Sequence, residues 1–175
     1  MRLFVAVDIP DSIRGQLALL QGGVPGARWT PQENFHLTLR FIGEVDGRTA
    51  HDIDLALAAV AASPFSISLA GLGVFSEKQP RVLWAGVARC EPLVALAAKI
   101  ELALQRIGLE PETRKFAPHV TLAKLRSPDM RRLREFLAAH GGFSAPPFPV
   151  GRFTLYSSLT HAEGSLYTAE RHYVL

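Results

Sequence analysis

Hydrophobic and polar positions follow two periods along this chain. Apolar and polar residues alternate in some stretches, which is typical of strands with one buried face, and apolar residues recur every three to four positions in others, which is typical of helices. The first pattern predicts strands at 2–8, 36–42, 65–75, 81–88, 118–125, 150–157 and 165–174. The second predicts helices at 11–22, 46–62, 91–107 and 128–140.

The ends of two helices carry further signals. Gly108 follows the apolar stripe of 91–107, as a residue that stops a helix does. Ser127 precedes the helix at 128–140, and we expect Ser127 as its cap and Pro128 at its first helical position. The proline-rich segment 145–149 predicts a loop.

Short, closely spaced strands favour antiparallel sheets with helices packed on the outside, an α+β fold. A chain of 175 residues is long enough to bury a sizeable core. We therefore expect one domain that spans residues 1–175.

One four-residue pattern occurs twice, nearly half the chain apart. Residues 36–39 are His-Leu-Thr-Leu and residues 119–122 are His-Val-Thr-Leu. On a strand, the His and Thr of each copy share one face and the two apolar residues share the other. Each copy leads through a turn to a predicted helix, so the two units resemble a degenerate repeat, with two related lobes facing each other.

The repeated residue types indicate acid–base chemistry. A single His-x-Thr on a strand is usually a half-buried polar pair without a function. Two copies in matching contexts favour a function. Imidazoles titrate near neutral pH, so two of them in one cleft can act as a general base and a general acid. The threonine hydroxyls add hydrogen-bond donors for a phosphate or carbonyl oxygen.

Composition narrows the class of protein. Hydrophobic residues make up 48% and charged residues 20%, as in globular proteins. The formal net charge of +3 is compatible with an anionic substrate but does not identify one.

Cys90 is the single cysteine, which excludes an internal disulfide and favours a cytoplasmic location. Residues 55–76 carry no charge, but their pattern changes from helical to alternating, so we expect no membrane span.

The segments around the two motifs, 34–45 and 114–124, resemble the paired motifs of the 2H phosphoesterase superfamily. Residues 1–10, Arg28-Trp29 and the tail from Leu155 are similar to further segments of one of its families, the RNA 2′,3′-cyclic phosphodiesterases, also called 2′-5′ RNA ligases. The resemblance extends over nearly the whole chain.

The resemblance implies a bilobal, pseudo-two-fold fold in which both His-x-Thr strands line a central cleft. It implies a substrate, RNA with 2′,3′-cyclic phosphate ends, hydrolysed to 2′-phosphate ends without a metal or another cofactor. It also implies a reverse reaction that joins RNA through a 2′-5′ linkage. The residues leave the oligomeric state open, and a monomer is compatible with them.

Carried onto this chain, the resemblance makes His36 and His119 the catalytic residues, with His36 as the acid on the departing 3′ oxygen and His119 as the base. Thr38 and Thr121 are expected to bind the phosphate. Lys124 is expected to add positive charge, although the family more often has arginine there, and lysine lacks the bidentate fork of arginine.

Three further residues are candidates for substrate contact. Arg40 shares the His36 face by its even spacing and could contact phosphate or lie in solvent. Phe41 could stack on a base at the mouth of the cleft, but its odd spacing from His36 opposes this on an ideal strand and leaves a core role as the alternative. Arg126 is a candidate for lining an RNA path, as are Arg114 and Lys115, with plain surface solvation as the alternative.

Other functions remain open or are disfavoured by the sequence. A zinc site on the two histidines lacks a third ligand at recognisable spacing, and no Walker-type loop indicates ATP use. The alternatives are a phosphodiesterase acting on small nucleotide cyclic phosphates or 2′-5′ oligonucleotides, and a non-catalytic RNA-binding module.

Overall fold

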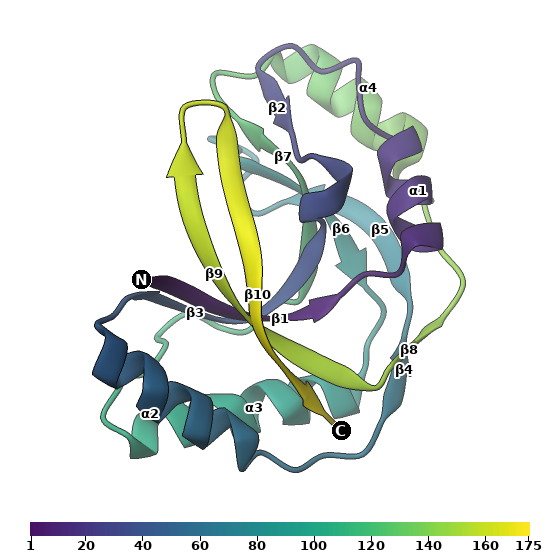
Figure 1. Ribbon diagram of the computed structural model, residues 1–175. Helices are drawn as coiled ribbons and strands as arrows, with labels where there is room; N and C mark the ends of the chain where they lie inside the picture. The colour runs from purple at the N-terminus through teal and green to yellow at the C-terminus, as the bar shows by residue number, and fades with distance from the viewer.

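The computed structural model describes residues 1–175 (Figure 1). It has four α-helices and one short 3₁₀ helix: α1 (Asp11–Leu19), α2 (Gly47–Ala58), α3 (Glu91–Arg106), α4 (Met130–His140) and η1 (Gln32–Asn34). The strands are β1 (Arg2–Asp8), β2 (Ala27–Trp29), β3 (His36–Glu44), β4 (Phe65–Ile67), β5 (Leu69–Val74), β6 (Val82–Val87), β7 (His119–Leu125), β8 (Phe148–Val150), β9 (Arg152–His161) and β10 (Gly164–Val174).

All strand pairs are antiparallel. The main sheet has the order β10-β9-β1-β3-β7-β6-β5, with β2 paired to β7, and β4 and β8 form a separate two-stranded sheet. Figure 1 shows α2 and α3 packed near β3 and β10 at one end of the molecule, and α1 and α4 near β2 and β5 at the other. The α+β class, with antiparallel sheets and helices outside, is therefore confirmed.

The two halves of the main sheet meet at a single point. The strands that carry the repeated motif, β3 and β7, pair in register only at Leu37 and Val120. The two expected lobes are thus halves of one continuous sheet, and the strands diverge on either side of this pair. An antiparallel pair has a local two-fold axis, so this contact relates the two motifs to each other.

Burial follows the alternation predicted for both motifs. Their four apolar residues are buried in the core: Leu37, Leu39, Val120 and Leu122. Their four polar residues are half-buried on the opposite face: His36, Thr38, His119 and Thr121. Each motif strand is therefore anchored by one face and presents imidazole and hydroxyl on the other.

Several predicted boundaries are corrected. Stretch 65–75 is two strands in different sheets, because β4 pairs with β8 and β5 pairs with β6. The predicted loop at 145–149 is wrong at its end, since β8 begins at Phe148.

The predicted cap of α4 is also wrong. Asp129 is the cap, accepting a 3.1 Å hydrogen bond from Arg132 N, while Ser127 adopts a left-handed turn conformation with φ of 43°.

Other boundaries differ by up to four residues: the helices predicted at 11–22 and 46–62 end at Leu19 and Ala58, and β9 runs from Arg152 to His161 where 150–157 was predicted. Gly108, with φ of 94°, follows α3 as expected. The uncharged stretch 55–76 consists of the end of α2 followed by strands. None of the helices combines the length and the apolar character needed to cross a membrane.

Candidate active site

The two motif histidines make the same local contact. His36 Nδ1 lies 2.7 Å from the carbonyl oxygen of Asn34, and His119 Nδ1 lies 2.7 Å from the carbonyl oxygen of Ala117. A carbonyl oxygen can only accept a hydrogen bond, so each Nδ1 carries the proton and donates it. This contact fixes the tautomer and the ring orientation, and it leaves Nε2 as the nitrogen that can exchange a proton with a substrate.

The register between β3 and β7 pairs each imidazole with a hydroxyl from the other motif. Continued outward from the Leu37–Val120 pair, it sets Thr121 opposite His36 and Thr38 opposite His119. The four polar side chains therefore gather around one point on one face of the sheet. This is the arrangement that the repeated motif predicted.

His36 lies among aromatic rings. Its ring centroid is 4.8 Å from that of Phe4 and 5.2 Å from that of Tyr167, which meets it edge-on. Tyr156 stacks on Phe4 at 5.2 Å. Burial lowers the pKa of His36, the hydrogen bond to Asn34 opposes this, and the charge of His119 lowers the pKa further. The neutral form of His36 is therefore favoured in the free protein.

His119 has a more open setting. Phe75, which is 58% exposed, meets its ring edge-on at 4.8 Å, and Trp84 lies 6.5 Å away. The indole of Trp84 lies close to two glycines: a Cβ would lie 2.5 Å from the ring at Gly73, and at Gly86 it would lie 2.7 Å from the Ala70 carbonyl oxygen and 3.3 Å from the ring. The missing side chains at these glycines thus create the room for Trp84 beside the site.

A cavity of about 620 Å³ opens beside His119 and Thr38. α3 contributes Val94, Ala97, Ala98 and Glu101 to one wall, Phe41 and Phe75 also line the cavity, and Arg114 adds positive charge. His36 does not line it. Its volume lies within the range of small-molecule sites, about 300–1,000 Å³. The site is thus asymmetric, with a covered histidine and one that faces open space.

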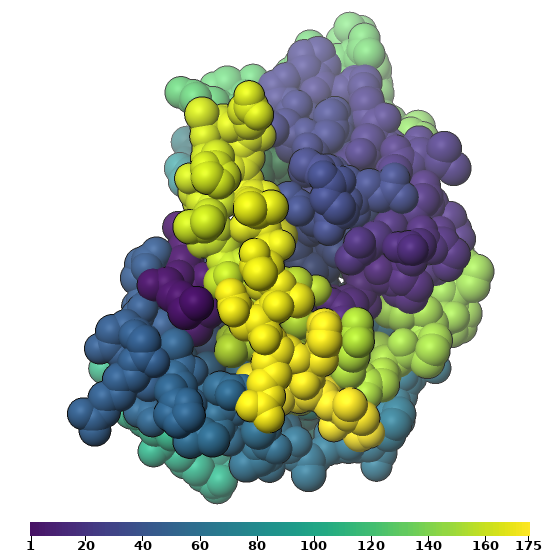
Figure 2. Space-filling model, viewed as in Figure 1, coloured from purple at the N-terminus to yellow at the C-terminus, as the bar shows by residue number.

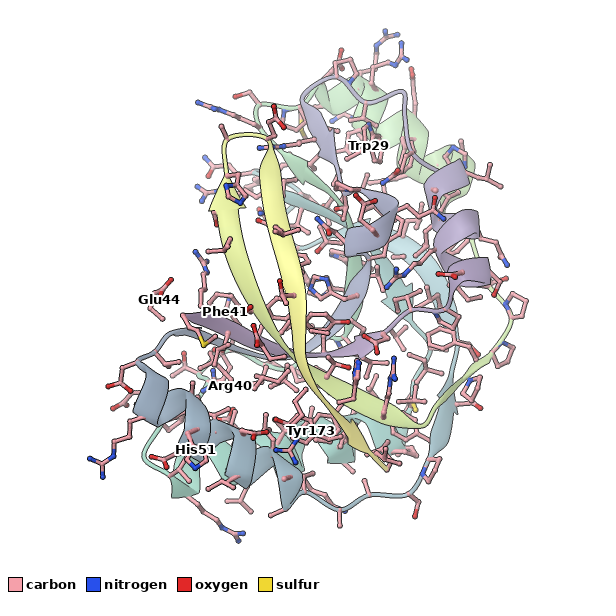
Figure 3. The ribbon with its side chains drawn as sticks, viewed as in Figure 1. Trp29, Arg40, Phe41, Glu44, His51 and Tyr173 are labelled. Carbon is pink, nitrogen blue, oxygen red and sulfur yellow. The ribbon has the colours of Figure 1, made fainter.

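A β-bulge in β3 reverses the expected faces of Arg40 and Phe41. Val5 pairs with Arg40 and Ala6 with Thr38, so Leu39 is an extra residue in β3. After this bulge Phe41 lies opposite Phe4, on the His36 face, and is 38% exposed. Figure 3 shows Arg40 on the helix side of β3 and Phe41 on the other side. The faces predicted from ideal strand spacing are therefore wrong for both residues.

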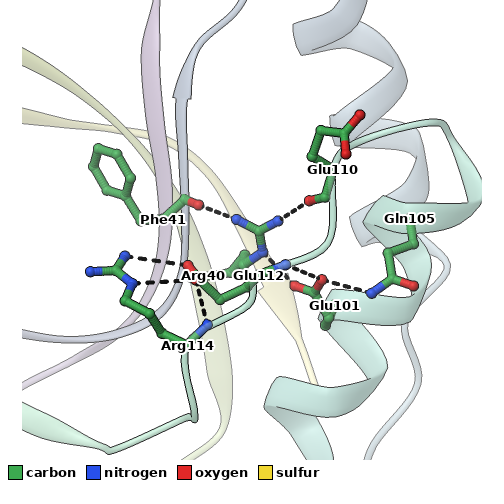
Figure 4. Close-up of polar contacts among 7 residues, drawn as sticks. All are labelled: Arg40, Phe41, Glu101, Gln105, Glu110, Glu112 and Arg114. Atoms are coloured by element: carbon green, nitrogen blue, oxygen red, sulfur yellow. Dashed lines mark hydrogen bonds and ion pairs between the residues drawn. The ribbon is translucent and has the colours of Figure 1, made fainter.

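The guanidinium of Arg40 is engaged by protein groups. It donates to Glu101 of α3, to the carbonyl oxygen of Phe41 and, at 2.6 Å, to that of Glu110 (Figure 4). Glu101 also accepts from Gln105 Nε2 at 2.8 Å and from Glu112 N at 2.9 Å. Burial raises the pKa of Glu101, but these hydrogen bonds outweigh it, and the pKa is lowered. The network ties the segment before His119 to α3 and β3.

Arg114 and Lys115 lie on the rim of the cavity. Arg114 bonds to Glu112 through its backbone N (2.9 Å) and through Nε and Nη2 (both 3.3 Å). These hydrogen bonds lower the pKa of Glu112 to about 2. The side chain of Arg114 is nevertheless 80% exposed. Lys115 is exposed as well, so both cations are accessible to a substrate that enters the cavity.

A bulge in β7 determines the side on which Lys124 lies. Leu83 pairs with Ala123 and Trp84 with Thr121, so Leu122 is an extra residue in β7. Leu122 and Ala123 are both buried, and Lys124 is exposed on the side of Thr121 despite its odd spacing from His119. Arg126 is exposed just beyond the end of β7, farther from His119.

Sequence reasoning missed the groups that surround the histidines: the carbonyls of Asn34 and Ala117, and the rings of Phe4, Tyr156, Tyr167, Phe75 and Trp84. Alternation in β1 carried a signal for one of them, because Phe4 falls on the opposite face from Leu3 and Val5. The other rings come from distant strands and have no local signal, whereas the two carbonyls lie only two residues before each histidine. Nowhere in the chain do three or more His, Cys, Asp or Glu side chains gather closely enough to hold a metal ion.

Comparison with known proteins gives consistent matches. A family model described as LigT like Phosphoesterase matches residues 7–84 and 87–167. An RNA 2′,3′-cyclic phosphodiesterase of Thermotoga maritima is 35% identical over 95% of this chain and 91% of its own length. One from Archaeoglobus fulgidus is 32% identical over 95% and 96%.

Solved structures agree over the full length. A crystal structure of a Thermus thermophilus protein superposes with a TM-score of 0.83 at 28% identity, covering 100% of this chain and 98% of that one. Escherichia coli LigT complexed with 3′-AMP superposes with a TM-score of 0.80 at 28% identity, covering 99% and 97%.

Proposed function

The chain belongs to the LigT-like phosphoesterase family, and we propose that it hydrolyses RNA 2′,3′-cyclic phosphate ends to 2′-phosphate ends. Relatives at 32–35% identity over 95% of the chain carry the name of this activity. The observation that carries the proposal for this chain is the matched pair of imidazoles, each with Nδ1 bonded to a carbonyl oxygen and Nε2 left for proton transfer.

In the proposed reaction, His119 Nε2 accepts a proton from the attacking water and His36 Nε2 donates one to the departing 3′ oxygen. The strained five-membered ring opens without a metal, provided that the incoming and leaving oxygens lie roughly in line across phosphorus. The lowered pKa of His36 makes its protonated form a stronger acid. The lowered pKa also reduces the fraction of His36 that is protonated. The negative charge of a bound phosphate stabilises the imidazolium and so offsets this reduction.

Thr38 and Thr121 are proposed to donate hydrogen bonds to the non-bridging phosphate oxygens, where negative charge grows in the transition state. Each stands beside the histidine of the other motif by register. Lys124 is proposed to add positive charge from the Thr121 side of β7. As an ammonium group it acts as a point charge, without a bidentate fork.

The cavity beside His119 is proposed to hold the nucleoside. Phe41 lies on the His36 face and partly exposes its ring in this cavity, so that a base can stack on it. Arg114, Lys115 and, more distantly, Arg126 are proposed contacts for the RNA backbone. Arg40 is proposed to support the cavity wall, since its guanidinium already bonds to Glu101 and two carbonyl oxygens.

The same geometry supports the reverse reaction, in which a 5′-hydroxyl replaces water and the histidines exchange roles, giving a 2′-5′ linkage. The proposed site draws on both halves of the sheet, so we treat residues 1–175 as one bilobal 2H phosphoesterase domain. No cofactor takes part in the proposed reaction.

The test is turnover in the presence of excess chelator. Three substrates separate the alternatives: a 2′,3′-cyclic mononucleotide, an RNA oligonucleotide ending in a 2′,3′-cyclic phosphate, and a 2′-5′-linked dinucleotide. We expect hydrolysis of the oligonucleotide end to a 2′-phosphate. Preference for the mononucleotide would instead indicate a small-nucleotide enzyme, and binding without turnover an RNA-binding module. Activity that chelator abolishes and zinc or manganese restores would contradict the metal-free mechanism.

A further inference from the structure

The β9–β10 hairpin extends past the sheet that supports it. β9 pairs with β1 only as far as Ser158, and the ribbon beyond it continues to the turn before Gly164. We call residues 159–167 the strap. It exposes Leu159 (61%) and Leu166 (55%), which pair with each other, so it buries little apolar surface of its own. An isolated two-stranded hairpin is marginally stable in water, and the position of the strap therefore depends on its other contacts.

The β9–β10 hairpin runs from one half of the molecule to the other, so the strap lies beside the half that carries β2 and η1 (Figures 1 and 2). Asn34 Nδ2 donates to the carbonyl oxygen of Ser165 at 2.9 Å, and Arg28 Nη2 donates to that of Ala162 at 3.4 Å. Tyr167, at the base of the strap, lies edge-on to His36 at 5.2 Å and to Phe4 at 5.1 Å. The shorter of the two polar tethers comes from Asn34.

Asn34 also holds the imidazole that the strap covers. Its backbone carbonyl oxygen accepts the hydrogen bond from His36 Nδ1, while its side-chain amide holds Ser165. One residue thus links the orientation of His36 to the position of the strap. His119 has no corresponding cover, since it faces the open cavity.

We propose that residues 159–167 form a strap closed over His36 and that Asn34 latches it, which makes Asn34 a positioning residue for the reaction. The closed strap keeps water away from the imidazole that protonates the leaving oxygen, whereas His119 stays accessible to water or a 5′-hydroxyl. The effect on turnover rests on the proposed function. The contact of Asn34 with the strap does not depend on the proposed function.

Opening the strap has a defined electrostatic result. The titratable groups that face His36 come from several elements around it: Asp8 of β1, Arg14 of α1, His119 of β7 and Tyr167 of β10. Tyr156 of β9 stacks on Phe4 and donates to Asp8, and so acts on His36 only through them. Burial is the largest cause that lowers the pKa of His36, while the Asn34 carbonyl and Asp8 raise it. When water returns to the imidazole, the pKa of His36 rises.

The experiment is an NMR titration of the His36 ring, assigned by its absence in His36→Ala. We expect Asn34→Ala and Tyr167→Ala to raise the pKa of His36, and Tyr167→Phe, which keeps the ring, to leave it unchanged. In Asn34→Ala the backbone carbonyl that orients His36 remains and only the bond to Ser165 is lost, so kcat should fall by about 10–100-fold, as when a supporting hydrogen bond behind a functional group is removed, with a smaller change in KM and a shift of the limb of the pH–rate profile that reports His36.

An unchanged His36 titration in folded Asn34→Ala overturns the latch. If Asn34→Ala does not fold, Tyr167→Ala is the test, because it leaves both hydrogen bonds of Asn34 in place. An unchanged His36 titration in Tyr167→Ala overturns the proposal that the strap covers His36. The titration needs no substrate. Absence of cyclic phosphodiester turnover in the wild type would therefore refute the proposed function, while the titration would still decide on the strap.

Discussion

His36 and His119 are related by a shared contact as well as by sequence. Nδ1 of each ring lies 2.7 Å from the carbonyl oxygen of the residue two positions earlier in the chain. The pair is thus matched in tautomer but unequal in environment, because aromatic rings cover His36 and the cavity opens beside His119. A general acid must give up a proton and a general base must accept one, so the two rings need different surroundings. The covered ring of His36 and the open ring of His119 have such different surroundings.

The first prediction concerns the two histidines. His36→Ala and His119→Ala should each lower kcat by about 10²–10⁴-fold, the usual contribution of a positioned acid or base. Because the two groups act in one step, the double variant should lose far less than the product of the single losses. Circular dichroism should show that all three variants are folded. Turnover near that of the wild type in either single variant would refute the paired assignment.

The second prediction separates transition-state stabilisation from binding. Thr38→Val and Thr121→Val nearly keep the shape of the side chain and remove its hydroxyl donor. If the hydroxyls act on developing phosphate charge, kcat should fall by at most about 10²–10³-fold, as for oxyanion-hole donors, with little change in KM. Steady-state kinetics on the cyclic-ended oligonucleotide measures both constants. A raised KM at constant kcat would make the threonines ground-state binders.

The third prediction concerns Arg40, which bonds to Glu101 with a side chain that is 10% exposed. Arg40→Met leaves the Glu101 carboxylate without its cation and should lower the free energy of unfolding by up to about 3–5 kcal/mol. Arg114→Met is the matched control. It breaks an ion pair whose arginine is 80% exposed and should cost about 0–1 kcal/mol. Urea unfolding measures both, and equal losses would contradict the buried role of Arg40.

The fourth prediction concerns acid stability. The folded protein holds the pKa of Glu112 at about 2, below its ordinary value of 4.5, and also lowers that of Glu101. The unfolded chain therefore binds more protons, and stability present above pH 4.5 should be lost as the pH falls towards 2. Urea midpoints across this range should fall less steeply in Glu112→Gln. Glu163→Gln, at an exposed carboxylate with no ion pair, is the control, and an equal flattening there would refute the assignment.

The motif residues were predictable because alternation on a strand is local. Both His-x-Thr pairs lie on one face and their apolar neighbours in the core, as the period of two predicted. The faces of Arg40, Phe41 and Lys124 were not predictable from spacing, because bulges at Leu39 and Leu122 shift the alternation by one residue. A bulge depends on pairing with another strand, and that pairing carries no signal in the bulged segment itself.

Long-range contacts define the rest of the site. The bond from Asn34 to Ser165 joins residues 131 positions apart, and the rings around His36 come from β1, β9 and β10. The cap of α4 was misplaced for a local reason. Ser127, Pro128 and Asp129 all suit a helix start, and the hydrogen bond to Arg132 N selects Asp129.

The central claim is that His36 protonates the leaving 3′ oxygen while His119 activates the nucleophile. The most direct measurement is single-turnover cleavage of a 2′,3′-cyclic substrate in which sulfur replaces the 3′ bridging oxygen, since a thiolate departs without a proton. We expect this substitution to restore most of the rate lost in His36→Ala and almost none of the rate lost in His119→Ala. If His36→Ala stays as slow on the sulfur substrate as on the oxygen substrate, or if His119→Ala is the variant restored, the assignment is contradicted.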